Sequence, residues 1–364
     1  MHTIKKLLGL SLLITLLPFS AFSEPDLRVG FSGPLTGPAA AWGIDVKNVL
    51  IFANEKLAQG RYKFVIEDDK CDPKEAVTIA HKFAGPEKLR YVFLVAGTVT
   101  LAAAPVYGRA NMLVMAPIVT PRAISNLGDY LFRTTPGDGV AAGVLAEKIA
   151  AKYRSVAVLT EQSEYSTGFL EDFAGAAKRK GLAISNEDYL QSETDFRSRL
   201  LRLASKQPEA MFVNANTERA FALILKQARD LKIKLPIFGA YIPGSAAFLK
   251  LAGNDAEGII FPDYPDARVL LNAEGQALYK EFVAQYGKLQ SFEYAFPAVL
   301  EAFRAFDAAV RDGADPKGYL HSREFNGTMG KFSFDQHGDV IGIQPALKII
   351  RGGQPGLLEL TQGG

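Results

Sequence analysis

Eight residues that could bind a ligand stand just after predicted strands, where open α/β sheets hold their ligands. Backbone N–H groups and hydroxyls near helix starts suit a carboxylate, because those donors and the helix dipole favour negative charge. Aromatic rings suit the apolar remainder of a small molecule. Taken singly, each residue could be an ordinary loop residue, but together they predict a ligand site. The eight are Trp42, Gly97, Thr98, Val119, Thr120, Tyr165, Asn216 and Tyr241.

The motifs of common enzymes are missing from the sequence. It contains no G-x-x-x-x-G-K-[ST] phosphate loop, no G-x-S-x-G nucleophile elbow and no H-E-x-x-H zinc pair. Asp68, Asp69 and Asp72 could suggest a cation site, but no bidentate acid follows at calcium-loop spacing, so a solvated turn is predicted. We therefore expect no enzyme, no cofactor and no bound metal.

The first 23 residues have the three parts of a secretory signal peptide. Lys5 and Lys6 precede an apolar run over residues 7–19, and Ala-Phe-Ser closes the segment at Ser23. We expect cleavage after Ser23 and export of the mature chain, with a retained membrane anchor as the alternative.

The charge balance argues against two classes of partner, nucleic acid and anionic membranes. The chain has 41 Lys+Arg and 39 Asp+Glu, and removal of Lys5 and Lys6 leaves 39 of each. A neutral chain gives no electrostatic reason to bind nucleic acid or an anionic membrane. Cys71 is the single cysteine, so no intramolecular disulfide can form.

Short apolar runs alternate with amphipathic segments, which predicts parallel sheets covered by helices on both faces. The first unit is a strand from Leu27, a Gly-Pro loop through Pro34 and Pro38, and a helix over residues 43–59. The 341 residues that follow the signal exceed what one core usually supports, so two domains are expected. Further predicted strands are 62–67, 91–95, 112–116, 155–160, 210–214 and 237–240; predicted helices include one beginning near Ala102 and one over 195–206 capped by Thr194.

Eight short stretches occur together in one order along the chain. They are GFSGPLTGP (30–38), DDKCDPKEAV (68–77), AP (116–117), FRTTP (132–136), YSTG (165–168), ILKQAR (224–229), AEG (256–258) and FDQHGD (334–339). In this order they resemble the periplasmic leucine/isoleucine/valine-binding protein family, type I solute-binding proteins of ABC importers.

The resemblance implies two Rossmann-like α/β lobes with parallel central sheets, joined by a three-strand hinge that closes on a ligand. It divides the chain into a signal peptide (1–23), an N-terminal lobe (24–135 and 264–336) and a C-terminal lobe (136–263 and 337–364). The three crossovers are expected near 133–136, 261–265 and 332–339.

The resemblance also implies roles for most of the eight residues. Trp42 matches the position of an aromatic residue that forms a wall of the ligand site. Tyr165 matches an aromatic residue that the C-terminal lobe contributes. Gly97 and Thr98 fall where hydroxyl and amide groups hold the ligand carboxylate, and Val119 and Thr120 at a second carboxylate-binding loop.

Three positions depart from the family pattern. Tyr241 stands where amino-acid-binding members carry an acid that pairs with the ligand ammonium, and Asn216 stands where they carry an aromatic. Ala96 replaces a cysteine that often bridges to the position of Cys71. A buried ammonium without an anionic partner is costly, so the change at Tyr241 argues against an α-amino acid.

We therefore expect a soluble, monomeric periplasmic binding protein that captures a small carboxylate-bearing solute and delivers it to an ABC permease. Candidate solutes are a branched-chain or other aliphatic amino acid, an aromatic acid and a small amide. Tyr241 and Asn216 favour the last two, because they offer neutral hydrogen bonds. The alternative is a sensing module that reports its ligand to a separate signalling protein, since fold alone does not fix function.

Overall fold

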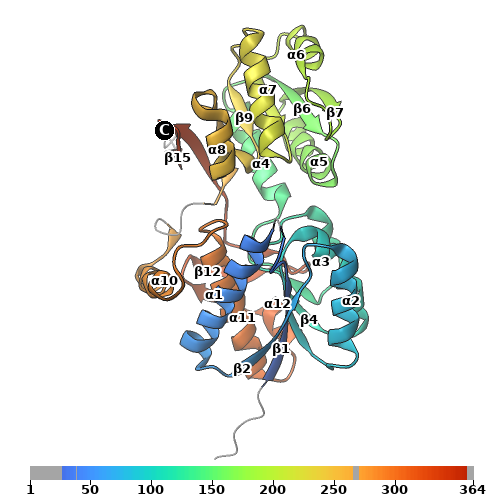
Figure 1. Ribbon diagram of the computed structural model, residues 1–364, viewed down its shortest axis with the longest axis vertical. Coiled ribbons are helices and arrows are strands. Elements are labelled where there is room, and N and C mark those ends of the chain that lie inside the picture. Colours follow the sequence, from blue (N-terminus) through green and yellow to red (C-terminus); the bar gives the residue numbers. More distant parts are fainter. Residues whose placement is uncertain (1–26, 38, 265–269, 359–364) are drawn as a thin grey trace, which may run out of the picture.

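The computed structural model describes residues 27–358, apart from Pro38 and residues 265–269. The predicted signal peptide and Pro38 of the first loop lie outside this part. Figure 1 shows two lobes, one above the other, connected by narrow segments of chain. No helix in the described residues has the length and apolar character needed to cross a bilayer.

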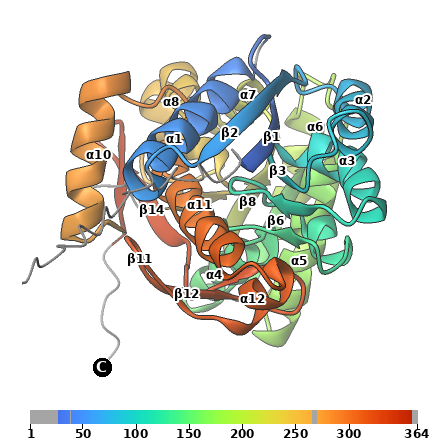
Figure 2. The same cartoon turned by 90° about the horizontal axis from the view of Figure 1, so that it is seen from below.

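Lobe 1 is built on a five-stranded parallel sheet with the order β2-β1-β3-β4-β5. Figure 2 shows α1 (Ala40–Ala58) and α11 (Ala295–Asp312) on one face, with α2 (Pro73–Ala84) and α3 (Gly97–Arg109) on the other. Apolar side chains alternate between two cores, so that Phe93 packs towards α11 while Val92 packs towards α3. The strands are β1 (Leu27–Gly33), β2 (Tyr62–Asp68), β3 (Tyr91–Leu94), β4 (Leu113–Met115) and β5 (Leu131–Phe132).

Lobe 2 is built on a seven-stranded sheet with the order β15-β14-β10-β9-β8-β6-β7. Its first five strands along the chain run parallel, and β14 and β15 add an antiparallel edge. The strands are β6 (Ser155–Glu161), β7 (Ala183–Tyr189), β8 (Ala210–Asn214), β9 (Ile237–Gly239), β10 (Ile260–Asp263), β14 (Ala346–Arg351) and β15 (Gln354–Leu357). The helices are α4 (Asp138–Ala150), α5 (Glu164–Arg179), α6 (Arg197–Ala204), α7 (Glu218–Asp230) and α8 (Ala246–Ala252), with η2 (Ile242–Gly244) and η3 (Gly253–Ala256) as 3₁₀ turns.

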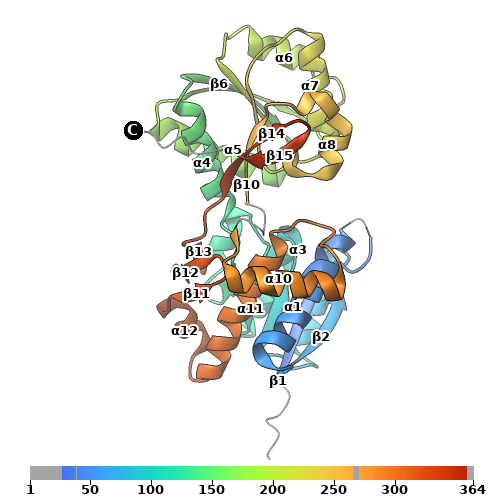
Figure 3. The same ribbon diagram turned by 90° about the vertical axis from the view of Figure 1, so that its left-hand side faces the viewer.

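The chain passes between the lobes between β5 and α4, after β10, and between β13 and β14 (Figure 3). Beside the main sheet of lobe 1 lies a small antiparallel sheet with the order β11-β12-β13. The remaining elements are η1 (Arg122–Asn126), α10 (Ala273–Tyr286), α12 (Pro316–Ser322), β11 (Phe325–Gly327), β12 (Gly330–Phe334) and β13 (Val340–Ile341).

The predicted fold class is confirmed, but several element boundaries are wrong. Helix α3 begins at Gly97 instead of near Ala102, because Ala96 takes φ 70° and turns the chain from β3 directly into the helix. Helix α6 begins at Arg197, and Phe196, not Thr194, precedes it. Strand β7 was not predicted, because this edge strand consists largely of polar, partly exposed residues.

Candidate functional site

The two predicted carboxylate-binding loops of lobe 1 touch each other. A Cβ on Gly97 would lie 2.4 Å from Cγ of Pro121, so only glycine lets the start of α3 approach the loop after β4 this closely. The first backbone N–H groups of an α-helix have no partner within the helix. Gly97 and Thr98 therefore present backbone donors beside Thr120, and the Thr98 side chain is exposed.

Arg133 fixes the backbone of this loop. It is 2% exposed, and its guanidinium donates to the carbonyls of Thr120 at 2.9 Å and Pro121 at 3.0 Å. It also forms an ion pair with Asp339 at 2.6 Å, which ties the loop to the start of β13. Val119 is fully buried in the lobe 1 core, so only its backbone is available to a ligand.

Asp138 at the start of α4 is a carboxylate that the sequence prediction did not single out. It is 4% exposed, and its Oδ1 has no hydrogen-bond partner among the described residues. The Thr120 hydroxyl bonds to this carboxylate, and the Thr120 carbonyl accepts the Asp138 N–H at 3.0 Å. Burial raises the pKa of Asp138 to about 6, and nearby Arg133 opposes the rise.

Three tyrosines lie near Asp138 at the junction of the lobes, and a fourth, Tyr294, stacks on one of them. Tyr241 stacks on Tyr264 with ring centroids 6.0 Å apart, and Tyr264 stacks on Tyr294 at 3.9 Å. The Tyr264 hydroxyl donates to the Pro136 carbonyl at 3.0 Å. Burial, followed by the charge of Asp138, raises the pKa of Tyr165.

Asp138 also affects two members of the stacked column. Burial first, and Asp138 among the further causes, raises the pKa of Tyr241 and of Tyr264. The structure thus brings Thr120, Tyr165 and Tyr241 together around a carboxylate with one free oxygen.

Trp42 lies apart from this cluster, in the first turn of α1. Its ring is 43% exposed and meets Phe292 edge to face, with centroids 6.5 Å apart. A Cβ on Gly43 would lie 2.0 Å from the Pro34 carbonyl oxygen, so glycine lets the helix start pack against the β1 loop. The result is an exposed aromatic pair on lobe 1, and the role of Trp42 in ligand binding stays a prediction.

Asn216 is also apart from the tyrosines. Its side chain is exposed, and its backbone N–H donates to Oε2 of the buried Glu161 at 3.0 Å. No hydrogen bond or ring contact within the described residues joins it to Tyr165 or Tyr241. Its place in the site remains a prediction.

The acidic turn after β2 is a structural brace for the β1 loop. Asp68 accepts hydrogen bonds from the Leu35 N–H at 2.8 Å and the Thr36 hydroxyl at 2.6 Å. Asp72 caps α2, whose first residue is the predicted Pro73. Across the described residues, no group of three or more His, Cys, Asp or Glu side chains could hold a metal ion. Burial raises the pKa of the free Cys71 thiol, which disfavours the reactive thiolate.

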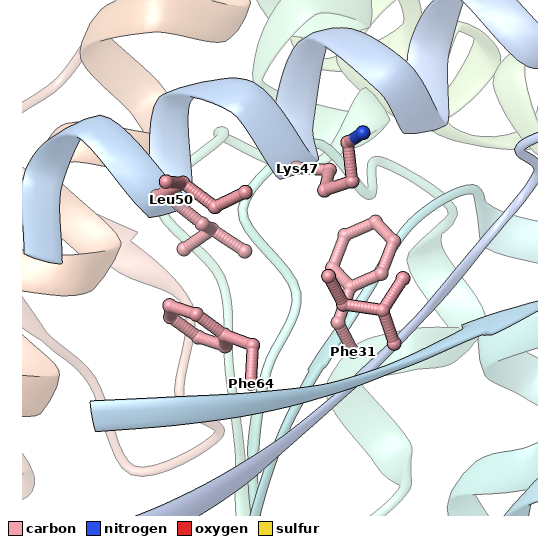
Figure 4. Close-up of a pocket in the computed structure, with 6 residues that line it drawn as sticks. Phe31, Lys47, Leu50 and Phe64 are labelled. Atoms are coloured by element: carbon pink, nitrogen blue, oxygen red, sulfur yellow. The ribbon is translucent and has the colours of Figure 1, made fainter.

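A shallow depression between α1 and the β1–β2 edge of lobe 1 is too small to hold a water molecule (Figure 4). Its lining surface is hydrocarbon, and the Lys47 ammonium group points away from it. We do not assign the solute to it. The lining residues are Phe31, Lys47, Leu50, Ile51, Phe64 and Ile66.

The sequence model of the periplasmic binding protein family matches residues 26–341, most of the chain. This chain belongs to that family. The resemblance identified from the sequence motifs is thereby confirmed. Members of the family are binding proteins, which agrees with the expectation that this chain is not an enzyme.

Several characterised family members are similar along nearly the whole chain. A leucine-, isoleucine-, valine-, threonine- and alanine-binding protein of Pseudomonas aeruginosa is 24% identical, over 88% of this chain and 90% of its own length. The Leu/Ile/Val-binding protein of Escherichia coli K12 is 22% identical, over 88% of this chain and 89% of its own length.

Solved structures share the fold. A leucine-binding protein of Thermotoga maritima superposes with a TM-score of 0.78 at 20% identity, covering 91% of this chain and 97% of its own. A solute-binding protein of Rhodopseudomonas palustris in complex with benzoate gives 0.74 at 19% identity, covering 92% and 96%.

The sequence did not predict a place in the site for Asp138, Arg133, Tyr264 or Tyr294. For Asp138 and Arg133, the sequence did contain one indication. The FRTTP stretch contains Arg133, and Asp138 follows it after a single glycine. Tyr264 and Tyr294 gave no such signal, because they approach each other only in the folded chain.

Proposed function

We propose that this periplasmic binding protein is the solute-binding component of an ABC importer. Its solute would carry a carboxylate and, close to it, an ammonium or amide donor. The names of its relatives support a branched-chain or related amino acid. We further propose that it is exported to the periplasm, as its relatives' family suggests, and presents its solute to a membrane permease.

The proposal that the solute has an N–H donor rests on Oδ1 of Asp138, which has no hydrogen-bond partner among the described residues. A buried carboxylate oxygen without a hydrogen-bond partner costs free energy, and an ammonium or amide N–H would relieve that cost. Tyr241 follows β9 (Ile237–Gly239), at the position where amino-acid-binding members of the family carry an acid. Asp138 lies close enough to Tyr241 to affect its titration, so it can supply the missing negative charge from α4.

The carboxylate end would bind lobe 1. The N-terminal N–H groups of α3 and the Thr98 hydroxyl would be the donors, Thr120 would hold Asp138 through its hydroxyl, and the contact between Gly97 and Pro121 holds the two loops together. Trp42 and Tyr165 would cover the apolar part of the solute, Val119 would contribute backbone only, and Asn216 would close the far side.

Closure of the lobes would then enclose the solute. We propose two lobes close to those expected from the sequence, with lobe 1 over 24–135 and 264–341 and lobe 2 over 136–263 and 342–364. The boundary expected after 336 moves to the end of β13, because β13 pairs with β12 of lobe 1. Hinge motion at the three connections would bring Tyr165 towards Trp42.

An aromatic acid is the second candidate solute. It is favoured by the stacked tyrosine column and by the benzoate bound to the similar Rhodopseudomonas palustris protein. Such a solute has no donor for Asp138, so the two candidates predict opposite effects of removing this carboxylate.

Isothermal titration of refolded, ligand-free protein with leucine, benzamide and benzoate would test the proposal. For a solute with an N–H donor, we expect Asp138→Asn to weaken binding about tenfold or more, because a bond to a charged partner is lost. The exposed Asp312→Asn is the matched control and should leave affinity unchanged.

Tight binding of benzoate that is retained in Asp138→Asn would favour an aromatic acid as the solute. It would refute the proposal that Asp138 binds an N–H donor of the solute. Absence of binding by any amino acid, amide or aromatic acid would refute the proposed function as a whole.

A further inference from the structure

Two further buried side-chain oxygens without hydrogen-bond partners among the described residues lie in lobe 2, near the start of α5. Asn214 and Ser166 are both 0% exposed. The Asn214 amide nitrogen donates to the Ser166 backbone carbonyl at 2.7 Å. Asn214 Oδ1 and Ser166 Oγ have no hydrogen-bond partner among the described residues.

The pair belongs to the edge of the lobe 2 sheet where the predicted ligand residues gather. Asn214 ends β8 and pairs in register with Thr160 near the end of β6, so its side chain emerges at the carboxyl edge of these strands. Alternation along β8 places it on the same face as Phe212, which packs with Phe169 of α5. Tyr241 also packs against Phe169, at 6.4 Å.

Tyr165, which precedes Ser166, is partly exposed. The buried pair therefore lies one residue from the surface of lobe 2, on the face occupied by Tyr165 and Tyr241.

The chemistry of the pair is defined by its existing bonds. Because the Asn214 nitrogen is bound to the Ser166 carbonyl, Oδ1 is left as an acceptor. The Ser166 hydroxyl can donate or accept, while its N–H is already bound by the Ser163 hydroxyl at 3.1 Å. Buried polar groups in native proteins are almost always paired with protein, water or ligand. One acceptor beside one hydroxyl fits a hydroxyl or a primary amide on the ligand.

We propose that Asn214 and Ser166 determine specificity by accepting a hydroxyl or amide at the far end of the solute. A purely hydrocarbon side chain would leave both groups unpaired and would bind more weakly. This inference rests on the proposed solute-binding function and adds the polarity of the solute's side chain. It is independent of Asp138, which would bind the donor at the other end.

Pairs of solutes with matched shape test this preference. We would titrate the ligand-free protein with valine and threonine, with leucine and asparagine, and with benzoate and 4-hydroxybenzoate. In at least one pair, the wild type should bind the polar member about tenfold more tightly than the apolar one.

Two variants remove the proposed contact. Asn214→Leu keeps the approximate shape, and Ser166→Ala is a smaller change that preserves the fold if the first does not. Either should reduce the preference to within about threefold, chiefly by weakening the polar member. Asn326→Leu, an exposed position on β11, is the matched control and should retain the preference.

The outcomes separate this inference from the proposed function. If solutes bind but the wild type shows no preference for the polar member, or if both variants keep that preference, the pair holds only a water and the inference is overturned. If no solute of any pair binds, the proposed function itself fails, and the inference with it.

Discussion

Replacing Asp138 with asparagine should make the unliganded protein more stable at neutral pH, although it weakens solute binding. Burial raises the pKa of this carboxyl group from 3.8 to about 6. A shift of about 2 units corresponds to about 3 kcal/mol, because each unit contributes about 1.4 kcal/mol. The side chain is 4% exposed, so little solvent screening reduces this value.

The sign follows from the proton balance. Between pH 3.8 and about 6 the folded chain holds a proton on Asp138 that the unfolded chain has lost. Stability contributed by this group therefore falls as pH rises through that window. Above it, the wild type carries the full cost of a buried charge, and Asp138→Asn does not.

Equilibrium urea unfolding of the mature protein from pH 3.5 to 8 would measure the effect. The free energy of unfolding of the variant minus that of the wild type should grow by about 3 kcal/mol between pH 4 and pH 7, then level off. Other carboxyl groups titrate in both proteins and largely cancel, and Asp312→Asn should give a flat difference. A flat curve for Asp138→Asn as well would refute the assignment of a buried charge at the start of α4.

Two further variants test the lobe 1 side of the site. Gly97→Ala places a methyl group 2.4 Å from Pro121 Cγ. It should destabilise the protein by about 1–3 kcal/mol in urea unfolding and weaken solute binding. A variant with the stability and the affinity of the wild type would contradict the close contact. Trp42→Ala should weaken binding by about 1–3 kcal/mol in titration calorimetry, because the exposed ring is proposed to cover the solute. Its free energy of unfolding should change by less than about 1 kcal/mol, and unchanged affinity would remove Trp42 from the site.

Most strands of the two main sheets could be predicted from the sequence, because they are short apolar runs, a pattern with few other structural interpretations. Leu94 and Val114, for example, belong to stretches that are buried on both faces, and burial of that kind leaves a continuous apolar pattern. The edge strand β7 was missed because its side chains are partly exposed and polar, so that pattern is lost.

The site was harder to predict, because its main properties arise from tertiary packing. An acid in the first turn of a helix is common at surfaces, and only the folded structure shows that Asp138 is buried with a free oxygen. Val119 was placed correctly along the chain, but its side chain turns into the core. Tyr264 and Tyr294 are thirty residues apart, and no local pattern predicts their stacking.

The contact between Gly97 and Pro121 has a consequence for how this protein could evolve. In the proposed site, the ligand carboxylate is bound by main-chain N–H groups, which survive most substitutions, whereas the groups proposed to recognise the rest of the solute are side chains such as Asn214 and Tyr241. Mutations in lobe 2 could therefore exchange one solute for another while lobe 1 continues to hold any small acid. New specificities would be reachable in single steps, without passing through a form that binds nothing.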